Sequence, residues 1–182
     1  MDYLKILKII GGIVLLVGLV FLQLSFIDNL PAPINNLNLV FILLFFLVLL
    51  LDYRLGLWAG VIVALLLEVY SALFFGGIIF PLIIALILVN FLFKLLFTNR
   101  SLFSLMILSF LGMVVYYFLN FIYLRLAFVL DLSAWQINLN SSYLINVMWE
   151  IFLVLFCLAI IFVSLRIFSR RFKSVFLVEG RR

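Results

Sequence analysis

The sequence predicts an all-α integral membrane protein, a six-helix transmembrane bundle that forms one domain over residues 1–182. About 70% of the residues are apolar and only 10% are charged, whereas a soluble domain has roughly 45–50% apolar and about 25% charged residues. A soluble fold of this size would expose much of the excess apolar surface to water. A transmembrane helix needs about 20 residues, so six helices fit the chain and leave residues for loops and ends.

The predicted spans are apolar runs separated by charged or helix-breaking segments. They cover roughly residues 6–27, 37–51, 55–75, 78–97, 102–124 and 143–165, and a basic tail follows over 166–182.

The first three runs have recognisable ends. The first is longer than a signal-peptide core and no A-x-A cleavage site follows it, so it is expected to remain as a helix. Pro31 and Pro33 then favour a loop. The second run is short for a span and ends before Arg54. The third run contains Glu68 and ends at the turn-forming pair Gly76-Gly77.

The last three runs are bounded in the same way. Pro81 fits the first turn of the fourth run, where its missing N–H is tolerated. A polar loop over 98–101 separates the fourth and fifth runs, and Arg125 closes the fifth. A polar stretch over about 130–142 precedes the sixth run.

The distribution of basic residues predicts the orientation of the chain, because cytoplasmic loops of membrane proteins are enriched in Lys and Arg. If the N-terminus is cytoplasmic, Arg125 alone lies outside. The other eleven fall on the cytoplasmic side: Lys5, Lys8, Arg54, Lys94, Arg100, Arg166, Arg170, Arg171, Lys173, Arg181 and Arg182. This distribution predicts six spans with both termini in the cytoplasm.

The composition excludes several chemistries. The chain has no histidine and one cysteine, Cys157, so it lacks a Ser-His-Asp triad, an HExxH zinc helix and a multi-cysteine metal site. No GxxxxGK[ST] sequence occurs, which excludes a P-loop. These absences exclude the chemistries named, and we predict no cofactor. In a membrane chain, the net charge of +5 indicates contacts with anionic membrane lipids rather than with nucleic acid.

A ladder of small residues predicts a helix-packing face on the third span. Gly56, Gly60 and Ala64 recur every four residues and so share one face of a helix. Gly56 and Gly60 form a GxxxG pair, which lets helices approach closely.

Polar residues within the spans form a second pattern. Glu68 and Glu150 both fall in the outer half of the membrane, where ionisable groups are rare and usually face the bundle interior. The candidate intramembrane polar cluster comprises Gln23, Glu68, Ser71, Asn120, Arg125, Asn146 and Glu150. These residues either converge beneath the outer surface, with Arg125 compensating a glutamate, or make separate interhelical hydrogen bonds.

The third span and its turn resemble a bacterial family, that of the rod shape-determining protein MreD. The resemblance is carried by the ladder ending at Glu68, by Ser71 and by the Phe75-Gly76 turn. Gln23 near the end of the first span, the loop containing Pro31 and Pro33, the chain length and the basic tail agree with it. In the family, Gly is common at the place of Ala64, and Asp at the place of Glu68.

The resemblance implies a non-catalytic scaffold of the cell-wall elongation machinery in the bacterial inner (cytoplasmic) membrane. The implied partners are an MreC-like protein, actin-like MreB, the RodA glycosyltransferase and a class B penicillin-binding protein. The six-helix layout is also similar to that of the S subunits of energy-coupling-factor transporters. The alternative functions are therefore an S subunit that binds a vitamin or another small molecule, and a small membrane enzyme acting on a lipid. In a scaffold, Glu68→Gln is expected to be mild, whereas a substrate-binding Glu68 would not tolerate it.

Overall fold

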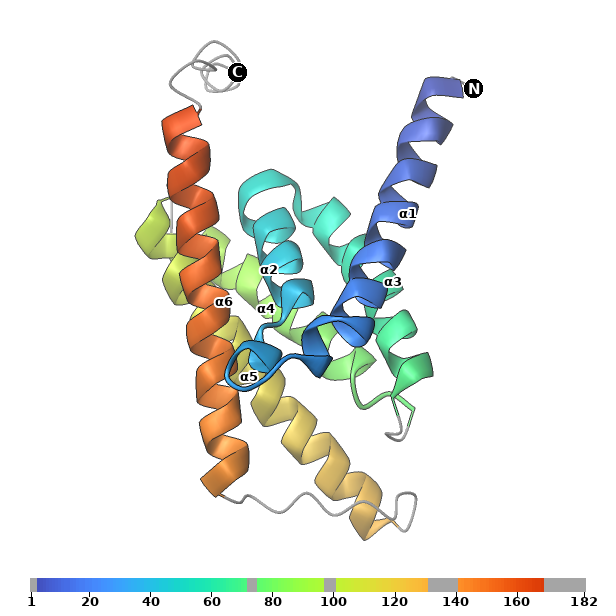
Figure 1. Ribbon diagram of the computed structural model, residues 1–182, viewed down its shortest axis with the longest axis vertical. Helices are drawn as coiled ribbons and strands as arrows, with labels where there is room; N and C mark the ends of the chain where they lie inside the picture. Colours follow the sequence, from blue (N-terminus) through green and yellow to red (C-terminus); the bar gives the residue numbers. More distant parts are fainter. Residues whose placement is uncertain (1–2, 72–74, 97–100, 131–140, 169–182) are drawn as a thin grey trace.

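The computed structural model describes residues 3–71, 75–96, 101–130 and 141–168, with side chains placed from residue 11 to residue 167. Every regular element in these ranges is helical, and Figure 1 shows their arrangement. The long helices are α1 (Tyr3–Ser25), α3 (Tyr53–Tyr70), α4 (Ile79–Leu96), α5 (Leu102–Val129) and α6 (Ser141–Phe168), while α2 (Leu39–Phe46) continues into a π-helix, η3 (Leu47–Leu51). Within these ranges, six segments are long and apolar enough to cross a membrane, which confirms the predicted all-helical membrane architecture.

The helix boundaries differ from the predicted runs mainly at the ends. The fifth and sixth helices are longer than predicted, each with 28 residues; the fifth continues past Arg125 because apolar residues follow it. The third helix stops at Tyr70, where Ser71 adopts an extended conformation. Most of the predicted polar stretch before the sixth span, and the tail from residue 169, lie outside the described residues.

Side-chain caps define the starts of three helices. Asn38 Oδ1 accepts a hydrogen bond from the backbone N–H of Phe41 at 3.2 Å and so begins α2. Asp52 caps α3, and Ser101 caps α5. These side chains satisfy N–H groups that have no partner within the helix.

The helices pack around a core in which α2, α3, α4 and α5 meet. Phe45 from α2, Val63 from α3, Leu86 from α4 and Met113 from α5 are fully buried there. By contrast, α6 packs on the bundle along one stripe that includes Val154 and Leu158, and most of its exposed residues are apolar. The first turn of α1 and the last turn of α6 lie at the same end of the bundle (Figure 1).

Small residues allow close contact within this core. Gly56, Gly60 and Ala64 are buried on one face of α3. A Cβ atom built on Gly60 would lie 2.5 Å from Leu86 Cδ1 of α4, and one built on Gly56 would overlap Val48 of η3. The structure therefore places the ladder of α3 against both α4 and the end of the second span.

Gly112 of α5 has an equally tight position, which the sequence had not indicated. A Cβ atom at Gly112 would lie 2.6 Å from Val89 Cγ2 of α4 and 2.7 Å from Phe45 Cε1 of α2. The glycines of α1 differ, since a Cβ atom at Gly11 or Gly18 would have nothing within 4 Å.

Candidate functional site

The seven residues of the predicted polar cluster do not converge. Glu68, Ser71 and Asn120 belong to one group at the turn between α3 and α4, which we call the turn group. Gln23 and Glu150 belong to another at the loop between α1 and α2, which we call the loop group. Arg125 and Asn146 are exposed and belong to neither group. Of the two alternatives left open by the sequence, a single cluster with Arg125 compensating a glutamate is not seen among the described residues, and the polar side chains bond in two separate groups.

Glu68 forms the centre of the turn group by capping the start of α4. Its Oε1 accepts a hydrogen bond from the backbone N–H of Gly76 at 2.9 Å. Its Oε2 accepts from the N–H groups of Ile78 at 3.1 Å and Ile79 at 3.0 Å. Helix N-termini present unpaired N–H groups and a partial positive charge. This environment explains why an acidic side chain that is 5% exposed is tolerated in the bundle.

Helix α5 holds the same turn from the other side. Asn120 Nδ2 donates to the carbonyl of Gly77 at 2.6 Å, and the hydroxyl of Tyr123 donates to the carbonyl of Phe75 at 2.6 Å. Gly76 has a φ of 99°, a conformation that side chains with a Cβ rarely adopt. The turn group therefore fixes an irregular backbone segment between α3 and α4.

Ser71 and Asn120 contact the backbone rather than the carboxylate of Glu68. The hydroxyl of Ser71 donates to the backbone carbonyl of Glu68 at 3.2 Å, which ends α3. The signal that could have identified the true partners was the glycine pair, since a turn between helices leaves N–H groups that an acidic side chain can accept.

In the loop group, Gln23 ties the end of α1 to the start of α2. Its Nε2 donates to Asp28 Oδ1 at 2.8 Å and to the carbonyl of Leu37 at 3.0 Å. Its Oε1 accepts from the N–H of Leu39 at 2.9 Å. The side chain is 7% exposed, and these three bonds use both ends of its amide. Gln23 therefore closes the α1–α2 loop.

Glu150 connects this loop to α5 and α6. Asn38, which caps α2, donates from Nδ2 to Glu150 Oε1 at 2.8 Å. Tyr117 of α5 also forms a side-chain hydrogen bond with Glu150. Asn38 and Tyr117 were not among the residues predicted from the sequence to form the polar cluster. An asparagine directly before an apolar run is an N-cap signal, but its second bond to a distant helix has no local signature.

Aromatic rings lie between the two groups. The ring of Tyr116 packs edge-on against Phe41 at 4.9 Å between centroids and against Tyr117 at 5.2 Å. Tyr116 also lies within electrostatic range of both Glu150 and Glu68. The two groups are therefore neighbours in the half of the bundle opposite to the first turn of α1 and the last turn of α6 (Figure 1), but their hydrogen bonds do not join.

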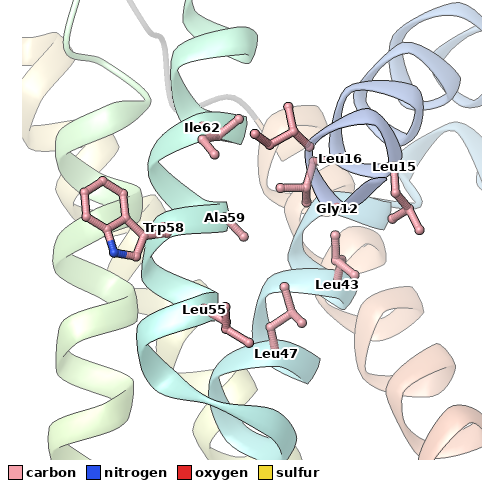
Figure 2. Close-up of a pocket in the computed structure, with 10 residues that line it drawn as sticks. Gly12, Leu15, Leu16, Leu43, Leu47, Leu55, Trp58, Ala59 and Ile62 are labelled. Atoms are coloured by element: carbon pink, nitrogen blue, oxygen red, sulfur yellow. The ribbon is translucent and has the colours of Figure 1, made fainter. Parts of the chain in front are cut away.

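Two hollows of the surface have apolar linings that contain no residue of either group. One of about 460 Å³ runs between α1 and the pair α2–α3, where Gly12, Leu16 and Ala59 form part of its lining; Figure 2 shows its walls. Another of about 410 Å³ lies on the outer half of α6 beside Trp149. In the described part of the chain, no three His, Cys, Asp or Glu residues are grouped to hold a metal ion.

Comparisons of the chain with protein-family models, with curated proteins and with solved structures gave no match.

Proposed function

We propose that the chain is a non-catalytic membrane scaffold of the machinery that elongates the bacterial cell wall. The supporting observation is how the intramembrane polar side chains are used. Glu68 and Asn120 bond to the α3–α4 turn, Gln23 bonds to the α1–α2 loop, and Glu150 bonds to Asn38. A ligand site needs polar groups that converge on the ligand, whereas these groups converge on the protein's own backbone and on one another.

The proposed setting is the bacterial inner membrane, with both termini in the cytoplasm. The eleven-to-one distribution of basic residues supports this orientation, and the common end of α1 and α6 is compatible with it. The proposed partners are an MreC-like protein and, with it, RodA and a class B penicillin-binding protein. The proposal of these partners is supported by the MreD-like pattern of α3, whose ladder of small residues and Glu68 lie in the packed core of the bundle.

The experiment is complementation in a rod-shaped bacterium depleted of its own MreD-family protein. We expect this chain to maintain rod shape and to co-purify with the MreC-like protein. Glu68→Leu should lose both properties because the α3–α4 turn loses its cap. Leu65→Ala is the matched control, since Leu65 lies on the same helix and is 44% exposed. A chain that inserts stably but neither restores shape nor recovers the partner would contradict the proposal.

A second candidate, the S subunit of a small-molecule transporter, is favoured by one observation. Both polar groups lie in the same half of the bundle, towards the predicted outer side, where such a subunit would receive its ligand. Native mass spectrometry of the purified protein separates the two functions. A stoichiometric small molecule that is lost in Asn38→Ala, with no effect of the chain on cell shape, would favour the transport subunit.

A further inference from the structure

The apolar segment of the second span, Ile34–Leu51, is long enough to cross a membrane, but its continuous helical part is shorter than a bilayer. From Asn38, which caps α2, to Asp52, which follows η3, the chain advances 14 residues, or about 20 Å at ~1.5 Å per residue. The hydrocarbon core of a bilayer is about 30 Å thick. The α1–α2 loop therefore lies below the outer boundary of that core when Asp52 lies at the inner boundary.

Helix α6 continues well beyond the level of this loop. The hydrogen bond from Asn38 to Glu150 marks that level on α6. Between Glu150 and the start of the helix at Ser141 lie nine further residues, or about 13 Å. Figure 1 shows the same step, since the lower ends of α5 and α6 extend past the loop. The projecting part of α6 carries large exposed apolar side chains, with Ile145 at 54% and Met148 at 70%, beside the exposed polar residues Ser142 and Asn146.

The α1–α2 loop has the opposite character. Asp28 and Asn29 are exposed, and within the described chain the buried Oδ1 of Asn35 has no hydrogen-bond partner. An exposed carboxylate is costly in hydrocarbon, and irregular backbone facing lipid is not tolerated there. A buried amide oxygen without a protein partner is normally satisfied by water. Each observation indicates that water reaches the loop.

No flat membrane surface can place the α1–α2 loop in water and the exposed apolar side chains of α6 in lipid at the same time. A surface at the level of the loop leaves the apolar outer turns of α6 in water, and a surface at the end of α6 buries Asp28 in hydrocarbon. A bilayer adapts to a short hydrophobic segment by thinning locally, at a modest cost for each ångström.

We propose that the α1–α2 loop forms the floor of a water-filled recess in the outer leaflet, so that the protein thins the bilayer beside α1 and α2 while α6 remains covered by lipid. The occupants of the recess are water and the polar headgroups of outer-leaflet lipids. This inference is independent of the proposed function, because it depends on helix lengths and exposure, and its assignment to the outer leaflet rests on the orientation predicted from the basic residues.

Thiol labelling in lipid nanodiscs tests the recess. The chain has one cysteine, Cys157, so wild type supplies the lipid-buried reference and a Cys157→Ala background carries single new thiols. The paired variants are Ala32→Cys in the exposed loop and Met148→Cys on the exposed face of α6, which lies slightly further outward than Glu150. We expect a water-soluble maleimide to label Ala32→Cys at least about tenfold faster than Cys157, because the reactive thiolate forms in water. Met148→Cys should label as slowly as Cys157.

The other three outcomes each overturn the proposal, and slow labelling of Ala32→Cys with fast labelling of Met148→Cys would place the recess on the wrong side of the bundle. Fast labelling of both new thiols would mean that the outer turns of α6 project into water from a flat membrane. Slow labelling of both would mean that the bilayer covers the loop. Circular dichroism and gel filtration of each variant verify that the helical fold is retained before labelling, and both substitutions are at exposed positions.

Discussion

Replacement of Glu68 by glutamine tests the capping role of this side chain. All three of its partners are donors, namely the N–H groups of Gly76, Ile78 and Ile79. The amide oxygen of glutamine can replace Oε2 and keep two bonds, but its NH₂ group then faces the N–H of Gly76. One hydrogen bond to a charged group, worth about 1.5–3 kcal/mol, is lost, and the two others lose their charge assistance.

We therefore expect Glu68→Gln to lower the free energy of unfolding by about 3 kcal/mol. Glu68→Leu, which leaves one buried and two partly buried donors unpaired at about 1–3 kcal/mol each, should cost about 5 kcal/mol. The three hydrogen bonds of Glu68 therefore change the expectation drawn from the sequence that the glutamine amide is an adequate replacement. The amide preserves size, but it does not present two acceptors to three donors.

Glu150→Gln provides the matched control. Glu150 accepts from Asn38 through Oε1 and pairs with the hydroxyl of Tyr117. A glutamine oxygen can keep the first bond, and its NH₂ can donate to the tyrosine oxygen, because a hydroxyl both donates and accepts. We expect this substitution to cost less than about 1 kcal/mol.

The assay is equilibrium unfolding of the purified proteins in mixed micelles titrated with a denaturing detergent, followed by tryptophan fluorescence. The reasoning requires Glu68→Gln to be clearly less stable than Glu150→Gln. Equal stability of the two variants, or a Glu68→Gln protein as stable as wild type, would refute the assignment of Glu68 as the cap of α4.

Two further substitutions test the packing and the loop by the same assay. Gly60→Leu should lower the free energy of unfolding by about 1–3 kcal/mol or more, because the new side chain would overlap a leucine of α4. Gly11→Leu is the control, because Gly11 has open space around it, and it should change the free energy of unfolding by less than about 0.5 kcal/mol. Equal effects of the two substitutions would contradict the close-packing argument. Asn38→Ala should cost about 2–3 kcal/mol, because it removes the cap of α2 and the partner of Glu150; an unchanged stability would show that this pair does not hold α6.

The fold was predictable because its strongest determinant is composition. Six apolar runs with charged boundaries define six spans regardless of how they pack, and the structure changes their ends by a few residues. The π-helix η3 was not predictable, because Leu47–Leu51 is as apolar as a regular helical turn. The close contact at Gly112 was also hidden, since a single glycine within a span has no spacing pattern to identify it.

The candidate residues were predictable as a set, but not their partners. Rarity of polar groups inside a membrane identifies Gln23, Glu68, Asn120 and Glu150 individually. Their partners are mostly backbone groups of turns, and a backbone group carries no signal in the sequence. Arg125 was considered a counter-ion because of its charge alone, whereas its exposed position follows from the rotation of α5.

The two glutamates differ in when their partners become available during synthesis of the chain. The N–H groups that pair with Glu68 lie 8 to 11 residues after it, so the α3–α4 hairpin can enter the bilayer with this carboxylate already paired. Asn38 precedes Glu150 by 112 residues, so its side chain has no access to this partner until the last helix has been synthesised. Docking of α6 is therefore the step that supplies the hydrogen-bond acceptor of Asn38 and completes the α1–α2 loop.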